Sequence, residues 1–273
     1  MAKSDRKLWN DPGLNFYCKV CRSTENNDFD YKKGLSRLSV DAYRYVGYEQ
    51  LVIGVRREKL LMKAARVDRV ESSMHRNFNN LKQDPVSNAI LSEYYFTGKV
   101  ALASSGNGNC LFNAVSILLA GDEIRATELR YRCTIEMVSN RDKMQRNRQF
   151  NSVQNVSGDY EKACVDFAHD KSWGCMWNVM ALSYVLNVKI EVVYPAVNGT
   201  DNYNFKAMNT TFRPPFTDPD KPTMTVMWTS VVPPKRRLFN PDSDVWKANH
   251  FVPLVSSTQK RQEIELVADD IEY

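Results

Sequence analysis

Long apolar runs are missing from this sequence. No stretch approaches the roughly 18 consecutive apolar residues of a membrane-spanning helix, and the opening residues 1–7 lack the apolar segment of a secretion signal. We therefore expect no membrane association and a location in the cytoplasm or nucleus. With 273 residues, of which 43% are hydrophobic, the chain is long enough for one sizeable core and a small extension.

A regular cysteine framework is also missing. The six cysteines lie at irregular positions, which are 18, 21, 110, 133, 164 and 175, so we expect reduced thiols instead of disulfides. Cys18 and Cys21 have the spacing of half a zinc site, but no second pair follows at a suitable distance. The sequence therefore predicts neither a metal nor an organic cofactor.

Cys110 stands where a loop passes into a helix. The loop 104–109 contains two glycines. After it, apolar residues recur at helical spacing as far as Gly121, and these are Leu111, Val115, Leu118 and Leu119. The free N–H groups and positive dipole end of a first helical turn favour a thiolate, and a glycine-containing loop lets backbone N–H groups reach an oxyanion. Cys110 is therefore the candidate nucleophile.

Histidine is scarce, because the chain has only three, at positions 75, 169 and 250. We interpret His75 and His169 as solvated surface residues, since both lie in charged or polar segments. His250 lies where a polar loop passes into the apolar run 251–255, so a rigid strand would hold its ring at a cleft. His250 is the candidate general base, with a satisfied polar group as the alternative for a lone histidine.

Three blocks of the sequence resemble the ovarian-tumour (OTU) cysteine proteases, most of which remove ubiquitin from proteins. The blocks, in the family's order, are Asn107–Phe112, the segment from Trp173 to Val192, and Asn249–Phe251. An ordered match of three blocks is more specific than one short motif. Within the family, the vertnin-related branch is the most similar. The segments that carry this similarity are Tyr194-Pro195, Phe212-Arg213-Pro214, Met227-Trp228 and the stretch 250–255.

The resemblance implies an α+β fold of the papain-like OTU type, a small central β-sheet flanked by helices. Alternating apolar residues predict strands over 188–194, 223–228 and 251–255. We divide the chain into an N-terminal helical and loop extension (1–85), an OTU-like catalytic domain (86–256) and an acidic C-terminal tail (257–273). In the extension, apolar residues spaced by threes and fours from Leu60 to Leu81 predict one amphipathic helix.

Two positions depart from the family's pattern. Asn107 stands where the family usually has aspartate, and Val252 stands two residues after the histidine, where the family usually has an acidic or amide residue. Asn107 can donate a hydrogen bond to an oxyanion, but it cannot stabilise an imidazolium by charge. The site then works as a Cys–His dyad or takes its third group from elsewhere. Candidates for that group are Asn249, Asp84 and Glu93.

The resemblance implies a deubiquitinase that acts on ubiquitin or polyubiquitin chains, or on a ubiquitin-like modifier. Cys110 would attack the isopeptide carbonyl, His250 would transfer the proton, and N–H groups of residues 107–110 would hold the oxyanion. Trp173 and Trp246 could line the cleft, although core positions are the simpler interpretation. Vertnin proper lacks the cysteine, so Cys110 implies a relative that kept the chemistry.

The alternative is a catalytically inactive OTU-like module that binds ubiquitin or nucleic acid. A weak nucleic-acid contact would use the basic residues between 56 and 69 and the run 235–237, within a chain whose net charge is +5. A solvated helix face is the simpler interpretation of these basic residues.

Overall fold

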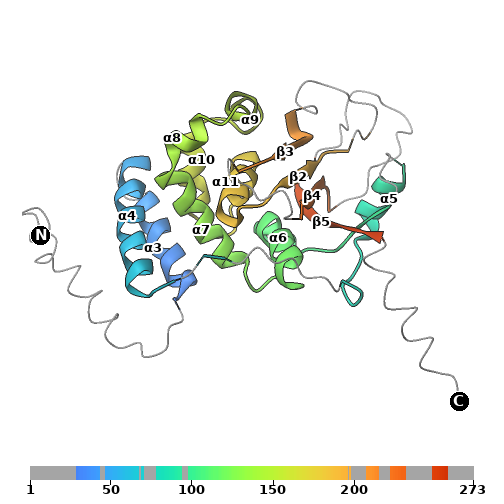
Figure 1. Ribbon diagram of the computed structural model, residues 1–273, viewed down its shortest axis with the longest axis horizontal. Helices are drawn as coiled ribbons and strands as arrows, with labels where there is room; N and C mark the ends of the chain where they lie inside the picture. Colours follow the sequence, from blue (N-terminus) through green and yellow to red (C-terminus); the bar gives the residue numbers. More distant parts are fainter. Residues whose placement is uncertain are drawn as a thin grey trace, which may run out of the picture.

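The computed structural model describes residues 29–43, 47–67, 69–70, 78–93, 98–195, 197, 207–214, 222–231 and 248–257. These residues form a mixed α+β fold, as expected, with a small sheet between layers of helices (Figure 1). The helices are α3 (Tyr31–Tyr43), α4 (Tyr48–Ala64), α5 (Pro85–Glu93), α6 (Cys110–Ala120), α7 (Ala126–Ser139), α8 (Arg141–Gln145), α9 (Phe150–Ser157), α10 (Tyr160–Phe167) and α11 (Met176–Leu186). None of these described helices is long and apolar enough to cross a membrane.

The sheet has five strands in the order β1-β5-β4-β2-β3. The strands are β1 (Lys99–Ala101), β2 (Ile190–Val193), β3 (Thr210–Phe212), β4 (Met224–Thr229) and β5 (His250–Ser256). The pair β2 and β4 is parallel, and the other pairs are antiparallel. The three predicted strands are therefore confirmed as β2, β4 and β5, with ends that differ by a few residues.

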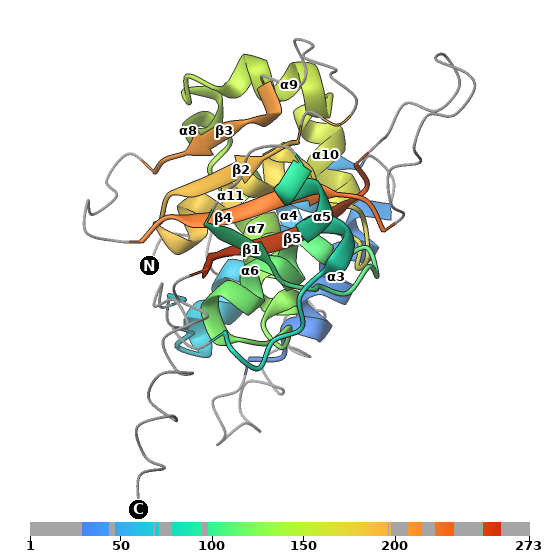
Figure 2. The same cartoon turned by 90° about the vertical axis from the view of Figure 1, so that its right-hand side faces the viewer.

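Each face of the sheet packs on its own set of helices. On one face, α6 and α11 form the main core, and α6 is buried at every residue from Cys110 to Leu119. A helix that is apolar all round belongs in the interior. On the other face, Ile90 and Leu91 of α5 pack against Val252 and Met227 of the sheet, and Figure 2 shows α5 lying across the strands. Strand β5 is therefore enclosed on both sides.

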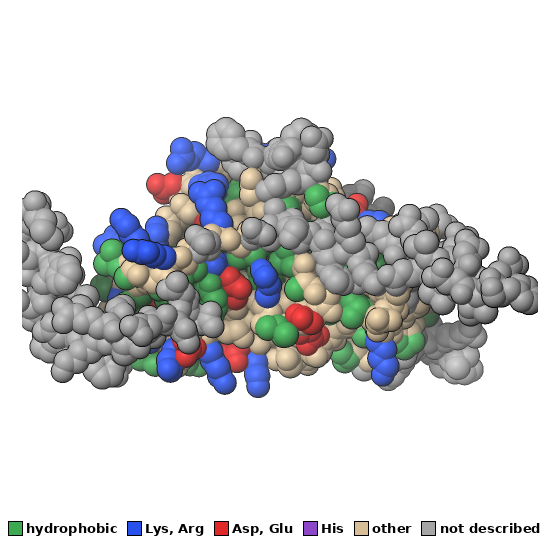
Figure 3. Space-filling model, turned by 60° about the horizontal axis from the view of Figure 1, so that its bottom comes forward, with side chains coloured by type: hydrophobic (Ala, Val, Ile, Leu, Met, Phe, Trp, Pro, Cys, Tyr) green, Lys and Arg blue, Asp and Glu red, His purple; other side chains and the backbone are tan. Residues whose placement is uncertain are grey.

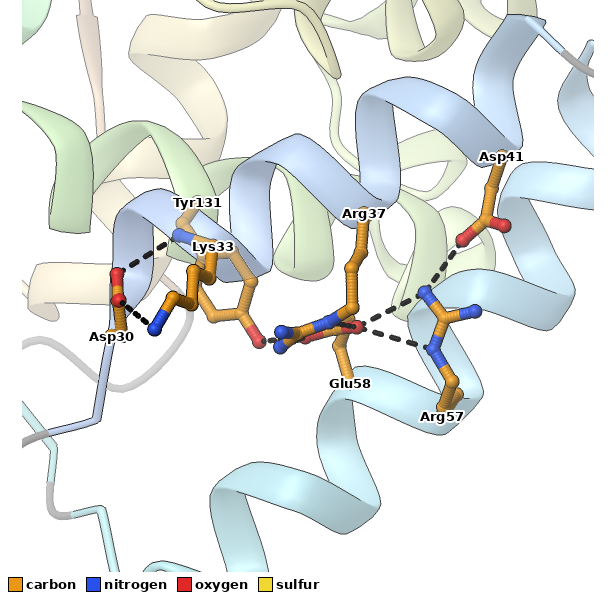
Figure 4. Close-up of polar contacts among 7 residues, drawn as sticks. All are labelled: Asp30, Lys33, Arg37, Asp41, Arg57, Glu58 and Tyr131. Atoms are coloured by element: carbon orange, nitrogen blue, oxygen red, sulfur yellow. Dashed lines mark hydrogen bonds and ion pairs between the residues drawn. The ribbon is translucent and has the colours of Figure 1, made fainter. Parts of the chain in front are cut away.

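Helices α3 and α4 lie against α7 on the side away from the sheet (Figure 1). A buried charge cluster joins the three helices (Figure 4). Glu58 of α4 is wholly buried and accepts two hydrogen bonds from Arg37 of α3, at 2.8 and 2.7 Å, and one from the hydroxyl of Tyr131 of α7, at 3.0 Å. Arg57 also contacts Glu58 and pairs with Asp41 of α3 at 2.7 Å. The helices assigned to the extension thus share polar contacts with α7.

The prediction of one amphipathic helix from Leu60 to Leu81 is wrong. Helix α4 ends at Ala64, and residues 65–67, 69–70 and 78–81 are not helical. Arg66 takes a left-handed φ of 52°, and the N–H of Val67 donates to the carbonyl of Met62 at 3.0 Å, as in a Schellman helix end. The apolar spacing arises instead because the chain beyond the helix also buries apolar side chains, among them Val70 and Phe78.

Candidate active site

Cys110 is the first residue of α6, and its side chain is almost completely buried. Burial raises the pKa of the thiol above its ordinary value of 9.0, while the backbone N–H groups of Phe251, Leu111 and Cys110 itself and the charge of Arg130 act in the opposite direction. The N–H groups at the helix start favour the thiolate, as expected, but burial has the larger effect on the pKa of Cys110. Removal from water outweighs the N–H groups, and the sulfur rests as a thiol.

His250 is the first residue of β5 and is also buried. Its Nε2 lies 3.1 Å from the carbonyl oxygen of Ser104 and 3.2 Å from the Ser104 hydroxyl. That hydroxyl donates to the carbonyl of Phe251 at 2.5 Å. Since a carbonyl can only accept, we assign the ring proton to Nε2, which leaves Nδ1 as an acceptor. The imidazole is therefore held in the tautomer of a general base.

The environment of His250 favours the neutral ring. Burial lowers its pKa below the ordinary value of 6.5, while the Ser104 carbonyl and the charges of Asp84 and Glu123 act in the opposite direction. Gly106 lies against the ring, because a Cβ built on this glycine would be 3.9 Å from Nδ1. The free nitrogen is thus next to the loop that leads to Cys110.

The cysteine and the histidine come together because β5 passes beside the first turn of α6. The backbone N–H of Phe251, the residue after His250, faces the Cys110 sulfur. Among the described residues, no hydrogen bond joins that sulfur to the imidazole, whose contacts are with Ser104. Catalytic hydrogen bonds are often long without substrate and shorten when it binds. Both partners of a Cys–His pair are therefore at the same place in the fold.

The family's usual acidic or amide position after the histidine is apolar for a structural reason. Val252 is wholly buried and packs in the apolar cluster that includes Ala101, Met227 and Leu254. A carboxylate there would lie in an apolar environment at a high desolvation cost. The orienting contact with His250 comes from Ser104 instead.

The three candidate third groups make other contacts. Asp84 accepts a hydrogen bond from the backbone N–H of Ser87 at 2.7 Å, at the start of α5. Glu93 is exposed at the end of α5, and the Asn249 side chain accepts from the N–H of Val231 at 3.4 Å. None of the three hydrogen-bonds to the imidazole in the described part of the chain. Ser104 was missed because the atom that holds the ring is a backbone carbonyl, which every residue type has.

Asn107 is exposed, and its amide has two distinct ends. The side-chain oxygen accepts from the backbone N–H of Asn109 at 3.0 Å and from the amide of Asn113 at 3.1 Å. This oxygen closes the loop and does not contact His250. The side-chain nitrogen has no partner among the described residues and can therefore donate.

The backbone N–H groups of residues 107–110 are the predicted donors to an oxyanion. Gly108 has a φ of 82°, and the N–H of Asn109 is taken by the Asn107 side chain. Within the described residues, the N–H groups of Asn107, Gly108 and Cys110 donate to no other residue. Of the oxyanion donors predicted for residues 107–110, only the Asn109 N–H is therefore excluded, and the Asn107 side-chain amide is a further possible donor.

Arg130 of α7 lies wholly buried behind this loop. Its Nε donates to the Asn109 side-chain oxygen at 2.6 Å, and its Nη2 donates to the Gly108 carbonyl at 3.0 Å. Burial lowers the pKa of the guanidinium to about 10, with Asp170 acting in the opposite direction. The segment Glu128-Leu129-Arg130 resembles the sequence that follows the cysteine motif in the OTU family, but no role for this arginine was predicted from the sequence.

Exposed apolar side chains flank the same loop. Trp173 is 65% exposed, Ile124 is 83% exposed and Val231 is 59% exposed. Val231 lies 3.4 Å from the Cβ position of Gly106, and the residue before Ile124, Glu123, accepts a hydrogen bond from the Ser105 backbone N–H at 2.6 Å. The interpretation of Trp173 as a core residue is therefore wrong.

Some residues singled out in the sequence have no site role in the structure or lie outside its described residues. His169 is half-buried, with Nδ1 2.6 Å from the Ser39 hydroxyl and its ring 4.0 Å from that of Tyr43, so the interpretation as a solvated residue is wrong. Five predictions concern residues outside the described part of the chain, and these are Cys18 and Cys21, His75, Trp246, the basic run 235–237, and the acidic tail 257–273 apart from its first residue.

Comparison with known proteins relates part of the chain to a known family. The family model "Vertnin, OTU domain" matches residues 101–160 and 142–229, which include Cys110 but end before His250. Residues 101–229 of the chain match the OTU domain of the vertnin-related branch. This confirms the resemblance read from the three sequence blocks.

Solved OTU structures are also similar to the chain. The OTUD1 OTU domain is 19% identical, with 58% of this chain and 86% of that chain covered and a TM-score of 0.39. The viral OTU protease of Dera Ghazi Khan virus is 14% identical, with 65% and 96% covered and a TM-score of 0.38. An OTU domain in complex with ubiquitin is 16% identical, with 59% and 71% covered and a TM-score of 0.36. No curated protein matches the chain.

Proposed function

We propose that this protein is an OTU-type deubiquitinase, a thiol hydrolase that cleaves the isopeptide bond after the C-terminal glycine of ubiquitin or a ubiquitin-like modifier. One observation carries the proposal. The Ser104 carbonyl holds Nε2 of a buried, neutral His250, and Nδ1 remains free beside the loop that ends at Cys110. A ring held this way can remove a proton from a neighbouring thiol.

The reaction begins from a neutral pair, because burial favours the thiol of Cys110 and the uncharged ring of His250. Nδ1 takes the thiol proton as the sulfur attacks the carbonyl carbon. The N–H groups of Cys110 and Gly108 and the amide of Asn107 donate to the oxyanion. The imidazolium then gives its proton to the leaving lysine amine, and the C–N bond breaks to leave a thioester on Cys110.

Water completes the cycle. His250 removes one proton from the water that attacks the thioester, the carbon–sulfur bond breaks, and that proton passes to the Cys110 sulfur. The product leaves as a carboxylic acid and gives its remaining proton to solvent. In the described part of the chain no charged group hydrogen-bonds to the ring, so the stabilisation of the imidazolium comes from the Ser104 carbonyl and from the charges of Asp84 and Glu123. An extended glycine-rich tail fits this account, since Trp173 and Val231 offer exposed apolar surface next to the loop.

The rival function is a ubiquitin-binding module that does not cleave. It is favoured by the deep burial of Cys110 and by the missing hydrogen bond between the thiol and the imidazole among the described residues. A nucleic-acid role has less support. On the face shown in Figure 3, basic side chains stand in separate groups with acidic ones between them, and nucleic-acid sites concentrate basic residues in one patch.

Cleavage of ubiquitin chains tests the proposal. The wild-type protein should release monomeric ubiquitin, and Cys110→Ala and His250→Ala should not. His75→Ala should behave like the wild type. Binding of ubiquitin should survive in Cys110→Ala, because a sulfur atom contributes little to an extended interface. Cleavage by Cys110→Ala would contradict the assignment of the nucleophile, and binding without cleavage by the wild type would establish the rival function.

A further inference from the structure

We propose that Arg130 is the positioning residue of the oxyanion loop: from inside the core it fixes residues 108 and 109 and joins them to the segment 167–172. This inference rests on the proposed function, since it names the group that shapes the site for the same reaction. It assigns a role to a side chain that does not touch the substrate.

Among the described residues, the hydrogen bonds of the guanidinium all go to the two segments. Besides the side chain of Asn109 and the carbonyl of Gly108, Nη1 donates to the carbonyls of His169 at 3.2 Å and Phe167 at 3.4 Å. Nη2 also donates to the carbonyl of Ser172 at 2.5 Å. All of these acceptors are uncharged oxygens. A buried arginine normally faces a carboxylate, whereas this one binds the backbone of two loops.

The two segments are in close contact only because Arg130 and a glycine allow it. A Cβ on Gly108 would lie 1.9 Å from the carbonyl oxygen of Lys171, so the loop lies directly on the segment 167–172. On the outer side, the amide of Asn109 donates to the carboxylate of Asp170 at 3.0 Å. The loop is thus held from inside by Arg130 and from outside by Asp170.

The Gly108 carbonyl contact determines where the next N–H group points. In a planar trans peptide, the carbonyl of Gly108 and the N–H of Asn109 point in opposite directions. With the carbonyl turned toward Arg130, that N–H meets the Asn107 side chain, which closes the turn. Cys110 follows immediately as the first residue of α6. Loss of the guanidinium would free this peptide to rotate and would change the geometry of the oxyanion donors.

The charge of Arg130 has a second consequence. The guanidinium lies 4.5 Å from the centre of the Phe112 ring. Burial lowers its own pKa, while the charges of Asp170, Cys133 and Cys110 raise it. The charge of Arg130 also favours the thiolate of Cys110, as one of several weaker influences opposed to burial. Lysine would keep the charge but not the planar set of donors. Substitution can therefore separate the effect of the hydrogen bonds on the loop from the effect of the charge on the Cys110 thiol.

The main experiment compares Arg130→Lys with Arg130→Gln. The first readout is the steady-state cleavage of ubiquitin chains. The second is the rate at which iodoacetamide alkylates Cys110, followed by peptide-resolved mass spectrometry. We expect kcat to fall about a hundredfold in both variants with KM little changed, the scale of an active-site displacement of about 1 Å. Alkylation should stay near wild type in Arg130→Lys and slow by about threefold or more in Arg130→Gln. Wild-type kcat in Arg130→Lys would overturn the positioning role.

A milder pair of variants covers the case in which the Arg130 variants fail to fold. Asp170→Ala removes the outer contact of the loop from an exposed position, and kcat should fall by about three- to tenfold with no change in Tm. Asp166→Ala is the matched control, because this exposed carboxylate pairs with Lys162 on the surface, at 2.7 Å, and makes no hydrogen bond to Arg130 or Asn109 among the described residues. Equal activity in the two variants would overturn the proposal.

A failure of the Arg130 proposal can be distinguished from a failure of the proposed deubiquitinase function. If the wild type cleaves no ubiquitin, the kcat comparison gives no signal, but alkylation of Cys110 still reports on Arg130. Slower alkylation in folded Arg130→Gln would then support the coupling of Arg130 to Cys110 without any deubiquitinase activity. Unchanged alkylation would overturn it.

Discussion

The loop before Cys110 should be intolerant of a single methyl group at Gly108. This glycine has a φ of 82°, and a Cβ there would lie 1.9 Å from the Lys171 carbonyl oxygen. Real Cβ contacts are essentially never below 3.0 Å, so Gly108→Ala must separate the loop from that segment by about 1 Å. A displacement of this size costs about a hundredfold in turnover, and the left-handed backbone adds about 1–2 kcal/mol of destabilisation.

Gly98→Ala separates the two effects. Gly98 has a similar φ of 86°, but nothing lies within 4 Å of its Cβ position. We therefore expect the free energy of unfolding of Gly98→Ala to fall only by the cost of the left-handed backbone. Its kcat should stay at the wild-type value. The assay is ubiquitin-chain cleavage together with thermal unfolding of both variants. Wild-type turnover in Gly108→Ala would refute the account of a loop pressed against residues 167–172.

Three other predictions concern the imidazole, the pH profile and the charge cluster. Ser104→Ala removes the hydroxyl contact but keeps the carbonyl, so kcat should fall by about tenfold or less; a measured loss above a thousandfold would mean that the hydroxyl acts in the chemistry itself. The pKa of His250 is lowered from 6.5 and that of Cys110 is raised from 9.0, so kcat/KM should fall only below pH 6.5 and above pH 9.0. An acid limb above pH 7 would indicate a carboxylate at the ring. Glu58→Gln removes the buried negative charge that Arg37 and Arg57 contact and should cost about 3–5 kcal/mol in chemical denaturation, whereas Tyr131→Phe should cost about 1 kcal/mol; equal losses would contradict the ionic role.

The sequence was sufficient for those elements whose apolar pattern is set by burial on the sheet. Helix α6 and the strands β2, β4 and β5 were predicted because they carry the core on regular spacing. Strands β1 and β3 were missed, since each has only three residues and lies at an edge of the sheet. The spacing of apolar residues also failed to predict the end of α4. The helix ends just before Arg66, which has a left-handed φ, while apolar residues continue along the chain.

The candidate site was only partly visible in the sequence. The nucleophile and the base were identified by residue type and by the motifs around them. His250 is held by the backbone carbonyl of Ser104, and Arg130 contacts a loop 37 residues further along the chain. Neither contact leaves a local pattern in the sequence. The buried state of Cys110 could not be read either, because it follows from the packing of β5 against α6.

Covalent capture of ubiquitin is the most direct test of the central claim. Ubiquitin that carries an electrophile at its C-terminus reacts only with a nucleophile that the binding site positions correctly. The wild-type protein should form a one-to-one adduct, with the modification on Cys110 in the peptide map. Cys110→Ala should form none, and His250→Ala should react at a strongly reduced rate. An unmodified wild type under conditions where ubiquitin binds, or an adduct on another cysteine, would contradict the account.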